Sequence, residues 1–287
     1  MSAAAAGLMP EYLLVESDRL GMGSGVVVRI VPGDMQAIGR DMARVMLDEI
    51  RAAQIRGRAA TFIVPVGPVD QYPILASEIN QKRIDCRELC MINMDEYLTD
   101  DDQWVPIDHP LSFRGYMDRM FYNRLDPALA PRQENRIFPD PRAPDRIQQR
   151  IESRGGVDVC FGGIGINGHI AFNEPPEAGV VIDNEAFAAL PTRALDLTGE
   201  TRTINSVTVG GEIAIIPHRA VTVGMKECLC VGKMRFYCNR PWQSAVVRRA
   251  LHGPVEASCP ASFLRRHADA EIAVAEYVAD RPDIRLR

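Results

Sequence analysis

The chain has 287 residues, 46% of them hydrophobic and 25% charged, which is enough to bury a large core and gives no sign of disorder. A formal net charge of -5 argues against non-specific binding to nucleic acid, because that binding depends on clustered Lys and Arg side chains. The opening residues, MSAAAAGLMPEY, lack the basic start of a signal peptide, and no later run is long enough to cross a bilayer. We therefore expect one globular domain over residues 1–287, located in the cytoplasm, with neither nucleic acid nor a membrane as its partner.

The seven cysteines include no paired CxxC arrangement. Cys86 and Cys90 are four positions apart, Cys228 and Cys230 are two apart, and the others are scattered. This spacing predicts neither a zinc site nor a disulfide framework.

Short apolar runs alternate with helical patterns along the chain. Residues 25–33, GVVVRIVPG, predict a strand, and Asp34 is placed to cap the helix that residues 35–56 predict. We expect further strands at 59–66, 89–98, 157–162, 219–225, 234–239 and 270–279, and further helices at 73–83, 112–125, 143–155 and 242–253. This alternation predicts an α/β protein with a largely parallel, covered sheet, whose ligands bind beyond the carboxyl ends of the strands.

Two acidic residues follow the apolar residues LCMINM. Because the side chains of a strand alternate, one of Asp95 and Glu96 should project into the ligand crevice while the other faces away. A carboxylate in such a crevice suits a general base, since burial raises its pKa toward neutrality. The alternative is that one of the two only caps a turn.

A second strand end, FGGIGINGHIAFNEP, is rich in glycine. Gly162, Gly163, Gly165 and Gly168 allow the main chain to approach a ligand closely, and His169 would then lie beside that ligand. The alternative is a glycine turn that packs a helix against the sheet. A dinucleotide site does not fit, because prolines interrupt the residues after the glycines, and no GK[ST] follows to form a P-loop.

Five segments resemble, in order, those of the glucosamine-6-phosphate deaminase (isomerase) family: INMDEYL, DHPLSF, GGIGINGHIAFNEP, TVGM and GPVEASCPASFLRRH. The resemblance spans most of the chain, and AFNEP distinguishes it from the sister lactonases that act on 6-phosphogluconate. It implies an open, mostly parallel Rossmann-like sheet with helices on both faces, no metal or organic cofactor, and a homo-oligomer. It also implies an enzyme that opens an amino-sugar ring, moves a proton between C2 and C1, and releases ammonia to leave a ketose.

The resemblance assigns roles to individual residues. Asp95 matches the family's proton-shuttling carboxylate, His169 its ring-opening histidine, and Glu174 the acid that supports the histidine. An imidazole suits ring opening because it exchanges protons near neutral pH. Asn167 completes the expected catalytic set. The expected substrate-binding residues are Gly67, Glu96, Gly163, Gly165, Gly168, Arg202 and Trp242.

Asn167 is a departure from the family, which usually has aspartate two residues before the histidine. An amide can orient an imidazole but cannot stabilise its charged form. We therefore expect weakened catalysis unless Glu174 supplies the missing carboxylate.

The larger departure concerns the phosphate group of the substrate. The family's anion-binding loop resembles T/S-G-G-T-P, whereas this chain has VPVGPVDQYP, with Val66, Pro68 and Val69 where hydroxyls or a donor N–H are expected. Val207 replaces a phosphate-binding arginine of the family, and Trp242 stands where it usually has a lysine. These changes predict a sugar without the 6-phosphate, or with another group in its place.

Two aromatic residues are candidates for contact with such a sugar. Trp242 and Tyr72 would stack on its apolar face, or else belong to the core or to an interface. Two other functions stay open: an aldose–ketose isomerase that releases no ammonia, and a sugar-binding sensor that has lost turnover.

Overall fold

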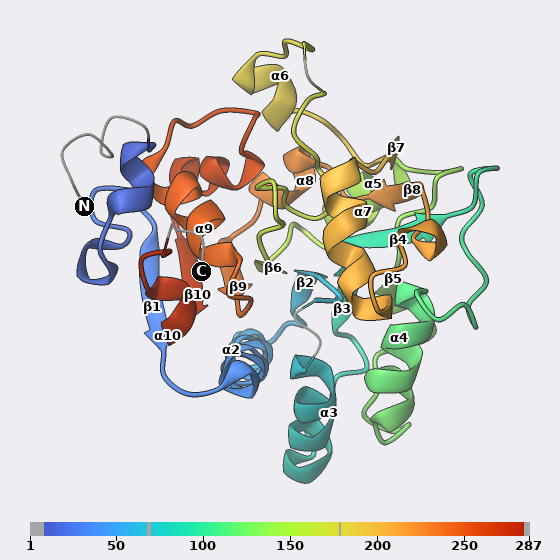
Figure 1. The fold of residues 1–287 in the computed structure, drawn as a ribbon. Coiled ribbons are helices and arrows are strands. Elements are labelled where there is room, and N and C mark those ends of the chain that lie inside the picture. The colour runs from blue at the N-terminus through green and yellow to red at the C-terminus, as the bar shows by residue number, and fades with distance from the viewer. Residues whose placement is uncertain (1–8, 68–69, 178, 284–287) are drawn as a thin grey trace.

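The computed structural model describes residues 9–67, 70–177 and 179–283. Its larger sheet has seven strands in the order β1-β10-β9-β6-β2-β3-β5, and neighbouring strands pair in parallel throughout. The strands are β1 Val27–Val31, β2 Thr61–Val64, β3 Cys90–Asn93, β5 Arg136–Ile137, β6 Val159–Gly162, β9 Lys233–Cys238 and β10 Ala270–Ala275. Helices cover both faces of this sheet (Figure 1), so the predicted α/β class is confirmed.

The long helices follow the predicted periodicity. They are α2 Met35–Ile55, α3 Gln71–Lys82, α4 Phe113–Met120, α5 Arg146–Ser153 and α9 Gln243–His252. The side chain of Asp34 caps α2 by accepting a hydrogen bond from the backbone N–H of Ala37 at 3.0 Å, as predicted. Ile38, Met42 and Met46 then recur on one face of α2 and are fully buried in the main core.

A second, smaller sheet was not predicted. It is antiparallel, in the order β4-β8-β7, and consists of β4 Asp95–Leu98, β7 Arg193–Asp196 and β8 Arg219–Thr222. The run at 89–98 is therefore two strands in two sheets, not one strand. Every residue from Cys90 to Leu98 is buried, so the run resembles one continuous strand and conceals the point where the chain changes sheet.

Met94 is the single residue between β3 and β4. Its backbone N–H donates to the carbonyl of Val64 in the larger sheet, at 2.9 Å. Its carbonyl accepts from the N–H of Val223, beside the smaller sheet, at 2.7 Å. The two sheets therefore join at the carboxyl end of β3, and Asp95 is the first residue on the far side of the junction.

Several other boundaries differ from prediction. The expected strand at 270–279 ends at Ala275 and continues as the short helix α10 Glu276–Ala279. The helix expected over 112–125 ends at Met120 and is followed by a 3-10 turn, Tyr122–Arg124. Three further helices were not predicted: α6 Asn184–Ala188 and α8 Met225–Leu229, which are too brief for periodicity to reveal, and α7 Gly199–Ser206, whose buried residues are polar.

Some sequence expectations fall outside the described part of the chain. They concern the opening residues 1–8, which include most of the segment weighed as a signal peptide, and Pro68 and Val69 of the expected phosphate loop.

Candidate active site

Asp95 begins β4 and lies at the carboxyl edge of the larger sheet. It is 9% exposed, and its Oδ1 accepts hydrogen bonds from Thr222 Oγ1 at 2.5 Å and from the backbone N–H of Phe172 at 3.1 Å. Within the described residues, Oδ2 makes no hydrogen bond. Asp95 therefore has one oxygen held by the protein and one available to a ligand.

Burial raises the pKa of the Asp95 carboxyl to about 7. The hydrogen bonds from Thr222 and Phe172 and the nearby charge of His169 act in the opposite direction but do not outweigh it. A carboxylate with this pKa can both accept and release a proton at neutral pH, as a general base requires. The rise that the sequence predicts is confirmed in direction.

The imidazole of His169 is held on its Nδ1 side. Nδ1 lies 2.9 Å from Asn167 Oδ1, 3.2 Å from Thr201 Oγ1 and 3.3 Å from Glu174 Oε2. An amide oxygen only accepts hydrogen bonds, so this network assigns the proton of the neutral ring to Nδ1. Nε2 then carries the lone pair, and it has no hydrogen-bond partner among the residues that the structure describes.

Asn167 connects the histidine to Glu174. Its Oδ1 accepts from His169, and its Nδ2 donates to Glu174 Oε2 at 2.7 Å and to Thr198 Oγ1 at 3.2 Å. An aspartate at this position could not donate to Glu174 without holding a proton itself. The amide therefore fits a site in which Glu174 supplies the negative charge.

The carboxyl of Glu174 is nearly buried, with Oε1 lacking any partner in the described residues. Burial by itself would raise its pKa, but the hydrogen bond and charge of His169, with hydrogen bonds from Asn167 and Thr201, lower it overall. Glu174 is thus ionised at neutral pH and close enough to stabilise a protonated imidazole.

Phe172 brings Asp95 and His169 together. Its backbone N–H binds Asp95, and its ring centroid lies 5.9 Å from that of His169. Ala171, just before it, has φ +54°, a left-handed backbone conformation that residues other than glycine rarely adopt. This strained residue turns the chain so that the N–H of Phe172 faces Asp95.

Two of the predicted ligand-binding glycines have structural reasons to be glycine. A Cβ at Gly165 would lie 2.1 Å from His169 Nε2, so the imidazole occupies the space of the missing side chain. Gly168 has φ +93°, and a Cβ there would lie 2.8 Å from Cys259 Sγ. At Gly163 the nearest atom to an added Cβ is the carbonyl oxygen of Tyr237 at 3.4 Å, so that position is less constrained.

The predicted substrate contact of Glu96 finds no support in the geometry. Its side chain is fully buried and binds the start of α4, accepting from Ser112 Oγ and from the N–H groups of Phe113 and Arg114, each at 3.0 Å. Arg114 Nε adds an ion pair at 2.9 Å. The alternative of a turn-capping acid therefore describes Glu96, while Asp95 faces the site.

The structure does not test whether Arg202, Trp242 and Gly67 contact a ligand. Arg202 does not pair with an acid in the described residues; it donates to the carbonyls of Ile213 at 3.2 Å and Ile216 at 3.4 Å. Trp242 is half-buried against the main core at the start of α9, and Gly67 is exposed after β2. Tyr72 is fully buried and donates to the carbonyl of Pro65, so the idea that it stacks on a sugar is wrong.

Three threonines of the site were not predicted. Thr222 binds Asp95, Thr201 binds His169, and Thr198 binds Asn167 and caps α7. Thr222 lies within the TVGM segment, but nothing in its spacing from Asp95, 127 positions away, indicates a contact. Only the pairing of β4 with β8 reveals it.

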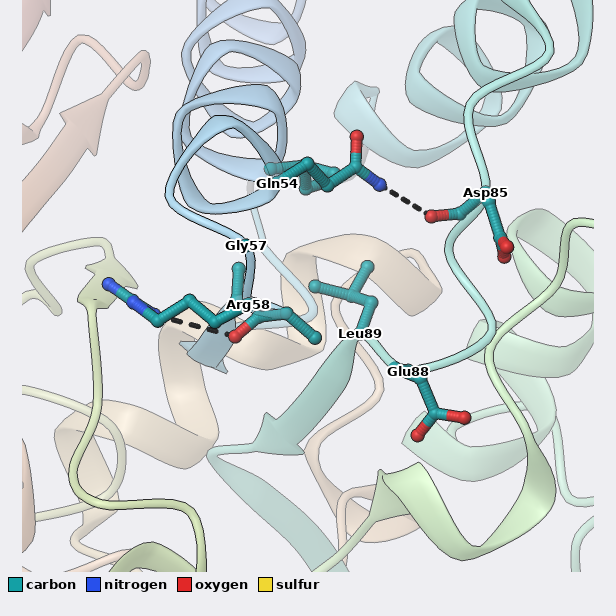
Figure 2. A pocket seen from close by; sticks show the side chains of 9 residues that line it. Gln54, Gly57, Arg58, Asp85, Glu88 and Leu89 are labelled. Atoms are coloured by element: carbon teal, nitrogen blue, oxygen red, sulfur yellow. Dashed lines mark hydrogen bonds between the residues drawn. The ribbon is translucent and has the colours of Figure 1, made fainter.

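The hollow shown in Figure 2 lies elsewhere, near the amino ends of β2 and β3. It has a volume of about 340 Å³, and its polar groups are already engaged. Gln54 donates to the carbonyl of Asp85 at 2.6 Å, and Arg58 pairs with Asp158. Ligands of open α/β sheets bind at the opposite, carboxyl edge, so we place the site at Asp95 and His169 instead.

The described residues offer neither a metal site nor a membrane span. No three side chains of His, Cys, Asp or Glu there gather closely enough to hold a metal ion. Among the same residues, none of the helices combines the length and apolarity needed to traverse a bilayer.

The relatives of this chain are enzymes of the sugar isomerase and hydrolase type, and the chain is an enzyme of the same type. No family model matches the sequence. The chain is 31% identical over 263 residues to the glucosamine-6-phosphate deaminase of Streptomyces coelicolor, covering 88% of this chain and 92% of that relative. It is 29% identical over 253 residues to that of Pectobacterium carotovorum, covering 85% of this chain and 88% of the relative. The chain belongs to the glucosamine-6-phosphate deaminase family.

Solved structures share the fold. A monomeric glucosamine-6-phosphate deaminase matches with a TM-score of 0.74 at 22% identity, over 88% of this chain and 100% of the other. A 6-phosphogluconolactonase from Thermotoga maritima matches with a TM-score of 0.61 at 15% identity, over 87% and 100%. The predicted Rossmann-like deaminase fold is confirmed.

Proposed function

We propose that this protein deaminates an amino sugar, with Asp95 as the proton shuttle between C2 and C1 and His169 as the ring-opening residue. One observation carries the proposal. Hydrogen bonds from the protein hold Asp95 Oδ1 and His169 Nδ1, while Asp95 Oδ2 and His169 Nε2 have no partner among the described residues. Both side chains also contact or bind Phe172, so one small ligand can reach them together.

The chemistry balances with one water molecule. His169 Nε2 takes the proton of the anomeric hydroxyl and delivers it to the ring oxygen as the ring opens. Asp95 then removes the proton from C2, whose bonding electrons form a double bond to C1 as a proton from solvent reaches the C1 oxygen. Asp95 returns its proton to C1, which leaves an iminium ion at C2, and water converts that iminium to a ketone and an ammonium ion.

Glu174 and Asn167 serve this sequence through His169. The Glu174 carboxylate, 3.3 Å from Nδ1, stabilises the imidazolium that forms when Nε2 accepts a proton. Asn167 orients the ring and keeps Nδ1 as the donor. The amide therefore preserves ring orientation, and the charge that it lacks is supplied seven residues later by Glu174.

We further propose that the substrate lacks a 6-phosphate. Val207, where the family has an arginine, is 69% exposed and offers no hydrogen bond to an anion. Trp242 replaces a lysine and packs against the core. Each charge-assisted hydrogen bond contributes roughly 1.5–3 kcal/mol, so losing two lowers the affinity for a phosphorylated sugar by roughly 10²- to 10⁴-fold.

The test is a substrate panel of glucosamine, galactosamine and their 6-phosphates. We expect ammonia release, and exchange of the C2 hydrogen in D₂O, with a higher kcat/KM for a free amino sugar than for its phosphate. Exchange without ammonia would instead identify an aldose–ketose isomerase. Binding without either signal would identify a sensor.

A matched pair of variants tests the phosphate argument separately. Val207→Arg should lower KM for glucosamine 6-phosphate and leave KM for glucosamine unchanged. Thr208→Arg, at an exposed neighbouring position, is the control and should do neither. Efficient turnover of glucosamine 6-phosphate by the unaltered protein would refute the argument.

A further inference from the structure

Thr222 contacts Asp95, the proposed proton shuttle, more closely than any other side chain that the structure describes. It is fully buried in β8, and the ladder places it directly opposite Asp95 of β4. Residues opposite each other in an antiparallel ladder project from the same face, so the hydroxyl meets the carboxylate, with 2.5 Å between Oγ1 and Oδ1.

The hydrogen bonds around Thr222 Oγ1 fix the direction of its proton. The oxygen accepts from the N–H of Phe172 at 3.0 Å, so its own proton must go elsewhere. Two acceptors are available: Asp95 Oδ1 at 2.5 Å and the carbonyl of Val223 at 3.3 Å. The shorter contact, to an acceptor that carries charge, is the stronger one.

We propose that Thr222 is a positioning residue that assigns different tasks to the two oxygens of Asp95. The hydroxyl and the N–H of Phe172 hold Oδ1, so Oδ2 alone accepts the proton from C2 and returns it to C1. This inference rests on the proposed function. Because neither donor lies at Oδ2, the proton can move to and from that oxygen without breaking either hydrogen bond.

Thr222 has a second effect, on the ionisation of Asp95. Its hydrogen bond favours the carboxylate form and so lowers the pKa, against burial, which raises it. The other charged or titratable groups that act on Asp95 are His169 from the loop after β6, Glu96 and Tyr97 from β4 itself, and Cys228 from α8. Arg193 of β7 lies opposite Thr222 in the same ladder.

The experiment replaces the hydroxyl by a methyl group of similar shape, in Thr222→Val. Loss of a hydrogen bond to a charged group should slow C2 hydrogen exchange by about 10- to 100-fold at pH 7. The acid limb of the pH–rate profile should move to higher pH by roughly one unit, because the carboxylate has lost a stabilising donor. Thr222→Ser keeps the hydroxyl and should restore both the rate and the profile.

Thr61→Val is the matched control. Thr61 is likewise a buried strand threonine, in β2, and its hydroxyl accepts from Arg154 rather than from a residue of the site. This variant should leave the pH profile unchanged. The proposal would be overturned if the pH–rate profile of Thr222→Val matched that of the unaltered protein. It would also be overturned if Thr222→Ser exchanged the C2 hydrogen as slowly as Thr222→Val.

A second readout does not depend on turnover. Titration of the Asp95 carboxyl by ¹³C NMR, assigned by its loss in Asp95→Asn, should give a higher pKa in Thr222→Val than in the unaltered protein. An equal pKa would refute the hydrogen bond's role. If no sugar shows exchange in the unaltered protein, the proposed function fails, while this titration still tests whether Thr222 holds Asp95.

Discussion

Asn167→Asp would restore the residue that the family usually has, and we expect it to be harmful here. In the structure, Asn167 Nδ2 donates to Glu174 Oε2 at 2.7 Å. An aspartate in the same place would bring a carboxylate oxygen against that of Glu174. Both cannot be ionised without repulsion, so the two acids would share one proton at neutral pH.

The size of the effect follows from this distance. Carboxylates that touch in this way have charge centres roughly 4 Å apart, and two like charges then repel by about 4 kcal/mol at an effective dielectric constant of about 20. That energy equals about three pKa units, so the upper pKa of the pair should lie at about 7, compared with about 4 for an ordinary carboxyl group.

The sign of the pH dependence distinguishes the two proteins. In the unaltered protein the pKa of Glu174 is lowered, so its carboxylate adds stability at neutral pH that is lost as the pH falls through the folded-state pKa. In Asn167→Asp the pair has a raised pKa. The stability that this pair contributes is fully present below the unfolded-state pKa of about 4, and it is lost as the pH rises through the folded-state pKa of about 7.

Urea unfolding at pH 5 and at pH 8 measures this difference. Relative to the unaltered protein, Asn167→Asp should lose about 3 kcal/mol more free energy of unfolding at pH 8 than at pH 5, because the loss develops between about pH 4 and about pH 7. Asn123→Asp, on the exposed surface, is the control and should show no such change. If the two pH values give the same difference, the direct contact between positions 167 and 174 is not what the amide serves.

Other predictions follow from single contacts. The rate of C2 exchange should rise through about pH 7 as Asp95 ionises, and Asp95→Asn should abolish exchange while sugar binding, measured by calorimetry, persists. Glu96→Gln should lower the free energy of unfolding by roughly 1.5–3 kcal/mol and leave KM unchanged; a raised KM would restore Glu96 as a substrate contact. Arg248 is fully buried and donates to the carbonyls of Val15 and Ala279. Arg248→Met should cost at least about 3 kcal/mol in urea unfolding, and an unchanged midpoint would contradict that anchoring role.

The sequence predicts the larger sheet well because local signals define its elements. Asp34 and the four-residue spacing of apolar residues in α2 are visible without any tertiary information. Strand alternation likewise indicates that Asp95 and Glu96 face opposite ways. It cannot tell which faces the site, and that assignment came from resemblance to the family.

The smaller sheet and the threonines could not be predicted, for a physical reason. β4, β7 and β8 are each four residues long and lie far apart in sequence. The sequence predicts strands that contain β4 and β8, but those patterns are equally compatible with a parallel sheet, so only the pairing assigns them to a separate antiparallel one. Thr222 takes its role from a partner in another strand, and no local pattern reports such a partner.

The single-residue junction at Met94 decides which acid does the chemistry. Side chains along β4 point alternately to opposite faces, so a deletion of Met94 that keeps both sheets paired would shift the strand by one place. Glu96 would then meet Thr222, Tyr97 would take the place of Glu96, and Asp95 would itself become the link between the sheets. The length of one link between two sheets thus determines the identity of the reactive acid.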